Sequence, residues 1–274
     1  MLEKYLNKWT ISSQAPKSID MVKVQRLTLN QKFTKCVTIV MKTKFNKSSR
    51  NLLIAMLLGD GTISNNFVFK LSHCQEQKEF LQWKINLLNN FGIRNNGIKE
   101  YICTKGYNIG KPVLYSQLNI IPFVKVLRRI FYKPKKNIAI RKLLNRLDAL
   151  GVAIWYMDDG ALSFRKTGDK VHGFYIRIST CIPKENLQII IDYFKEVWNI
   201  NFYMFKEGRD TYSLCCGTKE GIKFIDIVKP YVSQIPTMCY KINYDLSQRT
   251  RDLECKSNSL SRQFAETQNK QETV

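Results

Sequence analysis

The apolar and polar positions of this 274-residue chain repeat in the same order in two places. Residues 52–64 read LLIAMLLGDGTIS and residues 152–163 read VAIWYMDDGALS, so each apolar run ends in Asp-Gly. An apolar run of this kind predicts a buried helix, and the small residues after the glycine predict the start of a strand. A repeat on this scale predicts two halves that share one fold.

The segments that follow each apolar run also correspond. Residues 67–74 (FVFKLSHC) and 174–181 (FYIRISTC) predict strands, and residues 75–93 and 183–200 have the period of amphipathic helices. Each half then offers a hairpin and a closing helix, which gives the order helix–strands–helix–strands–helix. The expected fold class is therefore mixed α/β (α+β), built from two pseudosymmetric halves.

Alternation within the predicted strands separates an apolar face from a polar one. The apolar faces hold Phe67, Phe69 and Leu71 in the first half, and Phe174, Ile176 and Ile178 in the second. The opposite faces hold Val68, Lys70 and Ser72, and Tyr175, Arg177 and Ser179. We expect the apolar faces to pack on helices and the polar, partly basic faces to lie on a duplex.

Charge narrows the class of partner. The chain has 44 Lys and Arg against 22 Asp and Glu, a net charge of +22. Such an excess favours a polyanionic partner, with nucleic acid first and an anionic membrane second. No apolar run approaches the roughly 20 residues that span a bilayer, so we expect no membrane insertion.

Cysteine and histidine contribute little to the predicted chemistry. The eight cysteines form no CxxC pair, which argues against a zinc site or a disulfide framework and for reduced thiols inside a cell. His73 and His172 are too few and too far apart in the sequence for a histidine-built nuclease site. We expect each to be a surface or strand residue.

Composition suggests four segments. Residues 1–48 form a basic N-terminal extension, 49–144 the first half, 145–246 the second half, and 247–274 a disordered polar tail. The extension has three possible meanings: a nucleic-acid-binding arm, an organelle-targeting segment, or upstream sequence with no role in the fold.

The aspartates at the ends of the two apolar helices are the candidate chemistry. A carboxylate is disfavoured at the carboxyl end of a helix, which carries partial negative charge. Ala55 and Gly59 share one helix face and permit close helix packing, which would bring Asp60 and Asp159 together. A divalent cation would remove their repulsion, and carboxylates, carbonyls and water suit Mg²⁺. Beside a phosphodiester, such a site is typical of hydrolysis.

The two Asp-Gly runs resemble the paired motif of LAGLIDADG homing endonucleases. The most specific stretches are AIWYMDDG and, at residues 228–242, VKPYVSQIPTMCYKI, which resembles the closing helix and basic residue of the family. The resemblance implies two αββαββα halves whose sheets form a saddle over DNA, with the motif helices at the central interface. A chain with both motifs is expected to be a monomer.

The resemblance also implies roles for particular residues. Asp60 and Asp159 match the metal-binding acids, and Gly59 and Asp158 match the preceding position, whose carbonyl helps at the metal. Adjacent helical side chains diverge by about 100°, so Asp158 and Asp159 should not both ligate through carboxylates. Lys241, and Lys136 with Lys135 as a close rival, match basic residues that stabilise charge on phosphate. The implied cofactor is Mg²⁺, with Mn²⁺ as a substitute.

The expected function is a site-specific, double-strand DNA homing endonuclease with a long asymmetric target, read by side chains such as Lys70 and Arg177. Two alternatives stay open: an RNA maturase that binds its own intron RNA, and a DNA-binding regulator with an inactive site. Two intact acids favour cleavage. The Lys, Asn and Ile bias and the habit of the family suggest an intron gene in an organelle, either mitochondrion or chloroplast.

Overall fold

The computed structural model describes residues 47–104, 109–118, 122–132, 136, 138–168, 170–180, 182, 184–208 and 212–244. Among these described residues, those from Ser48 onward cluster as one compact unit. All but the last two residues of the predicted basic extension lie outside the described residues, as do the predicted tail and Lys135. Within the described part, no helix has the length and apolar character needed to cross a bilayer.

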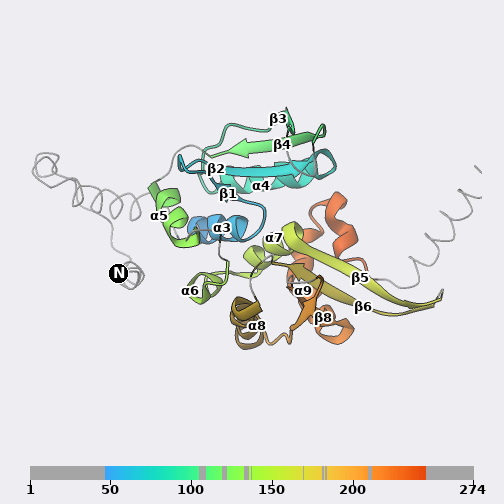
Figure 1. Cartoon of the computed structure of the whole chain (residues 1–274). Helices are drawn as coiled ribbons and strands as arrows, with labels where there is room; N and C mark the ends of the chain where they lie inside the picture. The colour runs from blue at the N-terminus through green and yellow to red at the C-terminus, as the bar shows by residue number, and fades with distance from the viewer. Residues whose placement is uncertain are drawn as a thin grey trace, which may run out of the picture. The chain divides into compact units, whose positions relative to one another are not determined.

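The first half follows the predicted order of elements (Figure 1). Its elements are α3 (Lys47–Leu58), β1 (Thr62–Ile63), β2 (Phe69–Cys74), the 3₁₀ turn η3 (Gln75–Gln77), α4 (Lys78–Asn90), β3 (Lys99–Ile102), β4 (Pro112–Gln117) and α5 (Pro122–Phe131). A short helix, α6 (Arg141–Leu144), precedes the second half.

The second half repeats this order. Its elements are α7 (Ala149–Asp159), β5 (Gly160–Thr167), β6 (Lys170–Ser179), α8 (Lys184–Trp198), β7 (Tyr203–Lys206), β8 (Tyr212–Gly217), α9 (Thr218–Val232) and the 3₁₀ turn η4 (Pro236–Lys241). The sheets have the orders β1-β2-β4-β3 and β5-β6-β8-β7, with every pairing antiparallel. The identical topology confirms the predicted fold class and its internal repeat.

One face of each sheet is covered by helices. In the first half α4 contacts β2 and β4, and in the second half α8 contacts β8 while α9 contacts β6. The predicted alternation holds in β6, where Phe174, Ile176 and Ile178 are buried. It also holds from Phe69 onward in β2, but the prediction for Phe67 is wrong. Phe67 precedes the strand with a φ of 60°, in a tight turn closed by its N–H bond to the Ser64 carbonyl.

Helices α3 and α7 are buried on every side. Residues 52–58 and 152–157 are each 3% exposed or less, as expected for helices without a polar face. Small residues set their separation: a Cβ at Gly151 would lie 3.4 Å from the Ala55 Cβ, and a Cβ at Gly59 would overlap Asp158 Oδ2. The predicted close approach at Ala55 and Gly59 is therefore confirmed.

Replacing Gly59 by alanine should destabilise the protein by about 1–3 kcal/mol, the usual cost of overpacking. The added methyl group must displace the buried Asp158 carboxylate. Urea unfolding would measure the loss. Gly217→Ala is the control, because a Cβ there meets nothing within 4 Å. Equal free energies of unfolding for Gly59→Ala and Gly217→Ala would contradict the close contact.

Candidate active site at the ends of α3 and α7

The side chain of Asp158 crosses from the second half into the first. It is fully buried, and its Oδ2 accepts a 3.1 Å hydrogen bond from the backbone N–H of Asp60. Its Oδ1 accepts a 2.5 Å hydrogen bond from Lys84 Nζ on α4. The carbonyl of Asp158 was predicted to help at a metal, and that role stays a prediction. The structure adds that the carboxylate of Asp158 lies at this interface. The absence of a side chain at Gly59 makes the crossing possible.

His73 also lies at this site. It belongs to the apolar face of β2 and is 4% exposed. Its Nε2 is 3.1 Å from Lys84 Nζ, its Nδ1 is 3.0 Å from Gln77 Oε1, and the same Nδ1 is 3.6 Å from Asp60 Oδ2. Burial and the Lys84 charge lower the pKa of His73 to about 3. The ring is therefore neutral, with Nε2 accepting from Lys84 and Nδ1 donating to Gln77.

His73 is a strand residue, as expected. Its position on the buried face of β2 brings it beside Asp60 and Asp158, which the sequence did not indicate. His172 lies on β6 and is exposed, as predicted.

Two lysines bind the carbonyls at the ends of the motif helices. Lys136 Nζ donates to the carbonyls of Gly59 at 2.5 Å and Gly61 at 3.1 Å. Lys241 Nζ donates to the carbonyl of Met157 at 2.5 Å and is 4% exposed. Each ammonium thus meets the partial negative charge at a helix carboxyl end, where cations are favoured. Burial lowers the pKa of both lysines, to about 8 for Lys241.

Asp60 and Asp159 are the more accessible acids. The side chain of Asp60 is 41% exposed, and Asp159 is half-buried, with its Oδ2 3.1 Å from Trp155 Nε1. Burial and the charge of Asp158 raise the pKa of both carboxyls, to about 7 for Asp159, where Asp60 adds to the effect. Lys136 opposes this shift in both. These two carboxylates carry negative charge that their surroundings stabilise poorly.

The structure therefore brings Asp60, Asp158, Asp159, Lys136 and Lys241 into one electrostatically coupled group. The roles assigned to them remain predictions. The carbonyl of Gly59, predicted to assist a metal, accepts from Lys136 instead.

Lys84 was not predicted as a site residue from the sequence. The feature that could have indicated it is its position in the buried stripe of α4, which consists of Phe80, Leu81, Lys84, Ile85 and Leu88. A lysine in such a stripe needs a partner, because an unpaired buried charge is costly.

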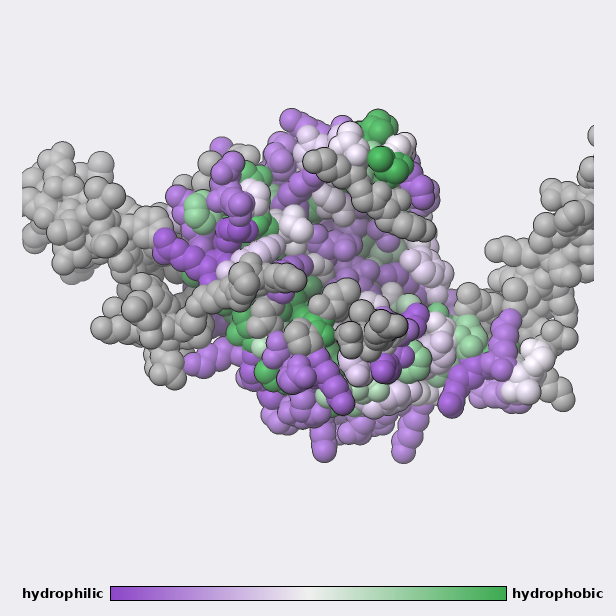
Figure 2. All heavy atoms as spheres, in the orientation of Figure 1, coloured by the Kyte–Doolittle hydropathy of each residue, from purple (hydrophilic) through white to green (hydrophobic). Residues whose placement is uncertain are grey.

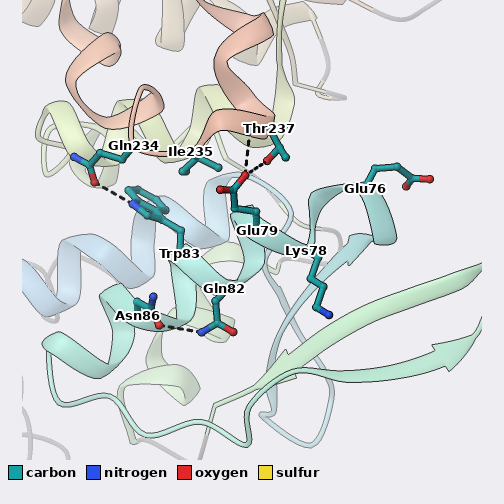
Figure 3. Close-up of a pocket in the computed structure, with 9 residues that line it drawn as sticks. All are labelled: Glu76, Lys78, Glu79, Gln82, Trp83, Asn86, Gln234, Ile235 and Thr237. Carbon is teal, nitrogen blue, oxygen red and sulfur yellow. Dashed lines mark hydrogen bonds between the residues drawn. The ribbon is translucent and has the colours of Figure 1, made fainter.

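Hydrogen bonds between α4 and residues 234 and 237 join the two halves (Figure 3). The Thr237 backbone N–H and hydroxyl donate to Glu79 Oε2 at 3.1 and 2.7 Å, and Trp83 Nε1 donates to Gln234 Oε1 at 3.1 Å. These residues line a groove of about 580 Å³. The contact anchors α4, which carries Lys84, against η4, which ends at Lys241.

The predicted duplex-facing residues occupy the uncovered faces of the two sheets. Lys70 and Ser72 in β2, and Tyr175, Arg177 and Ser179 in β6, are all half-buried. Lys70 Nζ lies 4.3 Å from the Tyr101 ring centroid and 4.6 Å from that of Tyr115. Arg177 Nε is 3.4 Å from Glu207 Oε1. Hydrophilic residues dominate the visible face of the described part (Figure 2).

Comparison with known proteins agrees with this geometry. A sequence model of the LAGLIDADG DNA endonuclease family matches residues 50–224. The chain belongs to this family. A solved structure of the homing endonuclease I-WcaI, bound to its DNA recognition sequence, covers 83% of this LAGLIDADG chain and 100% of its own, with a TM-score of 0.61 and 20% identity. That likeness shows the two-half fold.

Curated relatives of this LAGLIDADG protein carry the name RecA. The proteins from Mycobacterium shimoidei and Mycolicibacterium flavescens are each 28% identical to it, over 206 and 204 residues respectively. Each alignment covers 70% of this chain and 45% of the relative. The chain thus spans less than half the length of these relatives.

Without metal, ionisation of Asp159 should cost stability as pH rises from about 4 to 7. The pKa of Asp159 is raised to about 7 in the folded state, so this carboxyl binds more protons in the folded than in the unfolded state in this window. The lowered pKa of His73 acts in the opposite direction, so the contribution of Asp159 is the difference between the parent protein and Asp159→Asn. Unfolding free energies of both proteins in a chelator at pH 5 and pH 8 would measure this contribution, which should be on the order of one to a few kcal/mol.

Between pH 5 and pH 8 the change in unfolding free energy should be more favourable to the folded state in Asp159→Asn than in the parent protein, and the exposed Asp226→Asn should match the parent protein. Identical pH profiles for Asp159→Asn and the parent protein would refute the raised pKa.

Proposed function

We propose that this protein is a site-specific endonuclease that hydrolyses both strands of DNA with the help of a divalent metal ion. The observation that carries the proposal is the pair of accessible acids, Asp60 and Asp159, at the carboxyl ends of two matched helices. Burial and like charge raise the pKa of both, so both would gain from a cation. Membership of an endonuclease family and a net charge of +22 support DNA as the substrate.

The residues at the site suit a hard cation. Asp60 and Asp159 would hold it through carboxylate oxygens, which Mg²⁺ prefers and Mn²⁺ also accepts. Bound there, the ion would supply Lewis-acid chemistry and lower the pKa of a bound water. Lys136 and Lys241 hold positive charge beside the same acids, where it would stabilise charge that develops on phosphate.

A long asymmetric target would follow from the two sheets. They have the same topology but different side chains on their uncovered faces, so each would contact a different half-site. Because one chain contains both motif helices, a monomer would suffice for both strands. We propose a gene within an organellar intron, so the sequences that flank the intron would form the target when joined.

Asp60→Asn and Asp159→Asn should each abolish cleavage and retain binding. Each substitution removes a proposed metal ligand without changing the size of the side chain. Cleavage of the joined flanking sequence should be measured with Mg²⁺, and binding to the same duplex with Ca²⁺. Asp226→Asn is the matched control on an exposed helix face.

Cleavage by Asp159→Asn at the rate of the parent protein would remove that residue from the site. A parent protein that binds the intron RNA tightly but does not cut the duplex in the presence of any metal would instead support the maturase.

Lys70→Ala should weaken DNA binding and reduce the slope of log affinity against log salt by about one, because one phosphate contact releases about one counterion. Lys195→Ala on the exposed side of α8 is the control. Binding would be titrated by fluorescence anisotropy at several salt concentrations. A slope that Lys70→Ala leaves unchanged would place Lys70 outside the interface.

A further inference from the structure

The side chain of Lys84 ends in a place where water does not reach. Its side chain is 0% exposed, within the apolar stripe of α4. Transferring an ammonium group from water to such an environment costs several kcal/mol unless hydrogen bonds and an opposite charge replace its hydration. The groups around Lys84 therefore indicate which ligands this site offers to a cation.

Three groups surround the ammonium. Asp158 Oδ1 lies 2.5 Å from Nζ, His73 Nε2 lies 3.1 Å away, and the Phe80 ring centroid lies 4.2 Å away. A carboxylate oxygen and a neutral imidazole nitrogen are also ligands of divalent transition metals. Gln77 holds the other ring nitrogen of His73, as outer partners do for metal-binding histidines. The shell around Lys84 thus resembles the shell of a metal ion.

The same ligand atoms are close enough to share one ion. Atoms of Asp60, His73 and Asp158 all lie within 4.8 Å of one another. Lys84 Nζ is in contact with two of these three residues. While Lys84 is present, its ammonium competes with a metal ion for this place.

The cluster of Asp158, His73 and Lys84 is not repeated at the pseudosymmetric positions of the chain. The position that matches Asp158 in the first motif is Gly59. In the aligned strands, Thr180 matches His73, and the buried stripe of α8 is formed by Leu187, Ile190, Tyr193 and Phe194 without a lysine. The acid from the second half therefore occurs together with the histidine and the lysine from the first half, and the pseudosymmetric positions hold neutral residues. Their joint occurrence indicates that the three residues act together and did not arise independently.

We propose that Lys84 is a positioning residue whose ammonium takes the place of a divalent cation at Asp158 and His73, and so confines metal binding to Asp60 and Asp159. The inference rests on the proposed function only in assigning a metal to those two acids. With Lys84 in place, the Asp158 carboxylate stays directed across the interface, where it holds the backbone N–H of Asp60.

The test measures the number of metal ions bound per chain, and not the rate of catalysis. Isothermal titration calorimetry of the full chain with Mn²⁺ should find one more bound ion per chain in Lys84→Met than in the parent protein. Lys78→Met makes the same chemical change at an exposed position of α4 and should leave the number unchanged. Adding Asp158→Asn to Lys84→Met should remove the extra ion. Equal numbers of bound ions in Lys84→Met and the parent protein would overturn the proposal.

Thermal melting covers the case in which Lys84→Met is unstable. Mn²⁺ at about 100 times its dissociation constant should raise the melting temperature of Lys84→Met by about 5 °C or more beyond its effect on the parent protein. Lys84→Met/Asp158→Asn should lack this extra rise. A Lys84→Met protein that Mn²⁺ neither stabilises nor refolds would refute the inference. By contrast, a parent protein that neither binds Mn²⁺ nor cuts DNA would refute the proposed function.

Discussion

The close approach of α3 and α7 is the constraint on which the rest of the site depends. Gly59 has no side chain, so the Asp158 carboxylate passes over it and reaches the first half. Gly151 lets the same two helices meet near Ala55. Since both helices are buried on all sides, their ends can lie only where these small residues allow, and the acids at those ends meet as a consequence.

The close approach of the three acids creates electrostatic repulsion, which the lysines of the chain reduce in part. Asp60, Asp158 and Asp159 face Lys84, Lys136 and Lys241, three formal negative charges against three positive ones. Lys136 and Lys241 also bind helix-end carbonyls, which carry partial negative charge of their own. These lysines compensate the negative charge only in part, because the pKa of Asp60 and Asp159 stays raised in their presence. A cation at Asp60 and Asp159 would therefore stabilise the fold as well as serve chemistry.

The repeat makes the halves alike in topology and unlike in chemistry. Both sheets have the same order, and both motif helices end in Asp-Gly. Yet a buried lysine from α4 pairs with an acid from α7, and the second half has no matching pair among its described residues. Under the proposed function, matched backbones with unmatched side chains would let one chain contact two different half-sites of an asymmetric target.

Sequence alone determined the repeated order of elements, the alternation of β6 and the small residues at Ala55 and Gly59, because periodicity and residue size are local properties. It also singled out Asp60, Asp158, Asp159, Lys136 and Lys241 through a family resemblance. Only the tertiary structure decided which carboxylate crosses the interface, since that depends on the space above Gly59. It likewise decided that His73 and Lys84 lie with the acids. They are separated from Asp158 by more than 70 positions in the sequence. A local sequence pattern does not predict a contact between residues so far apart in the chain.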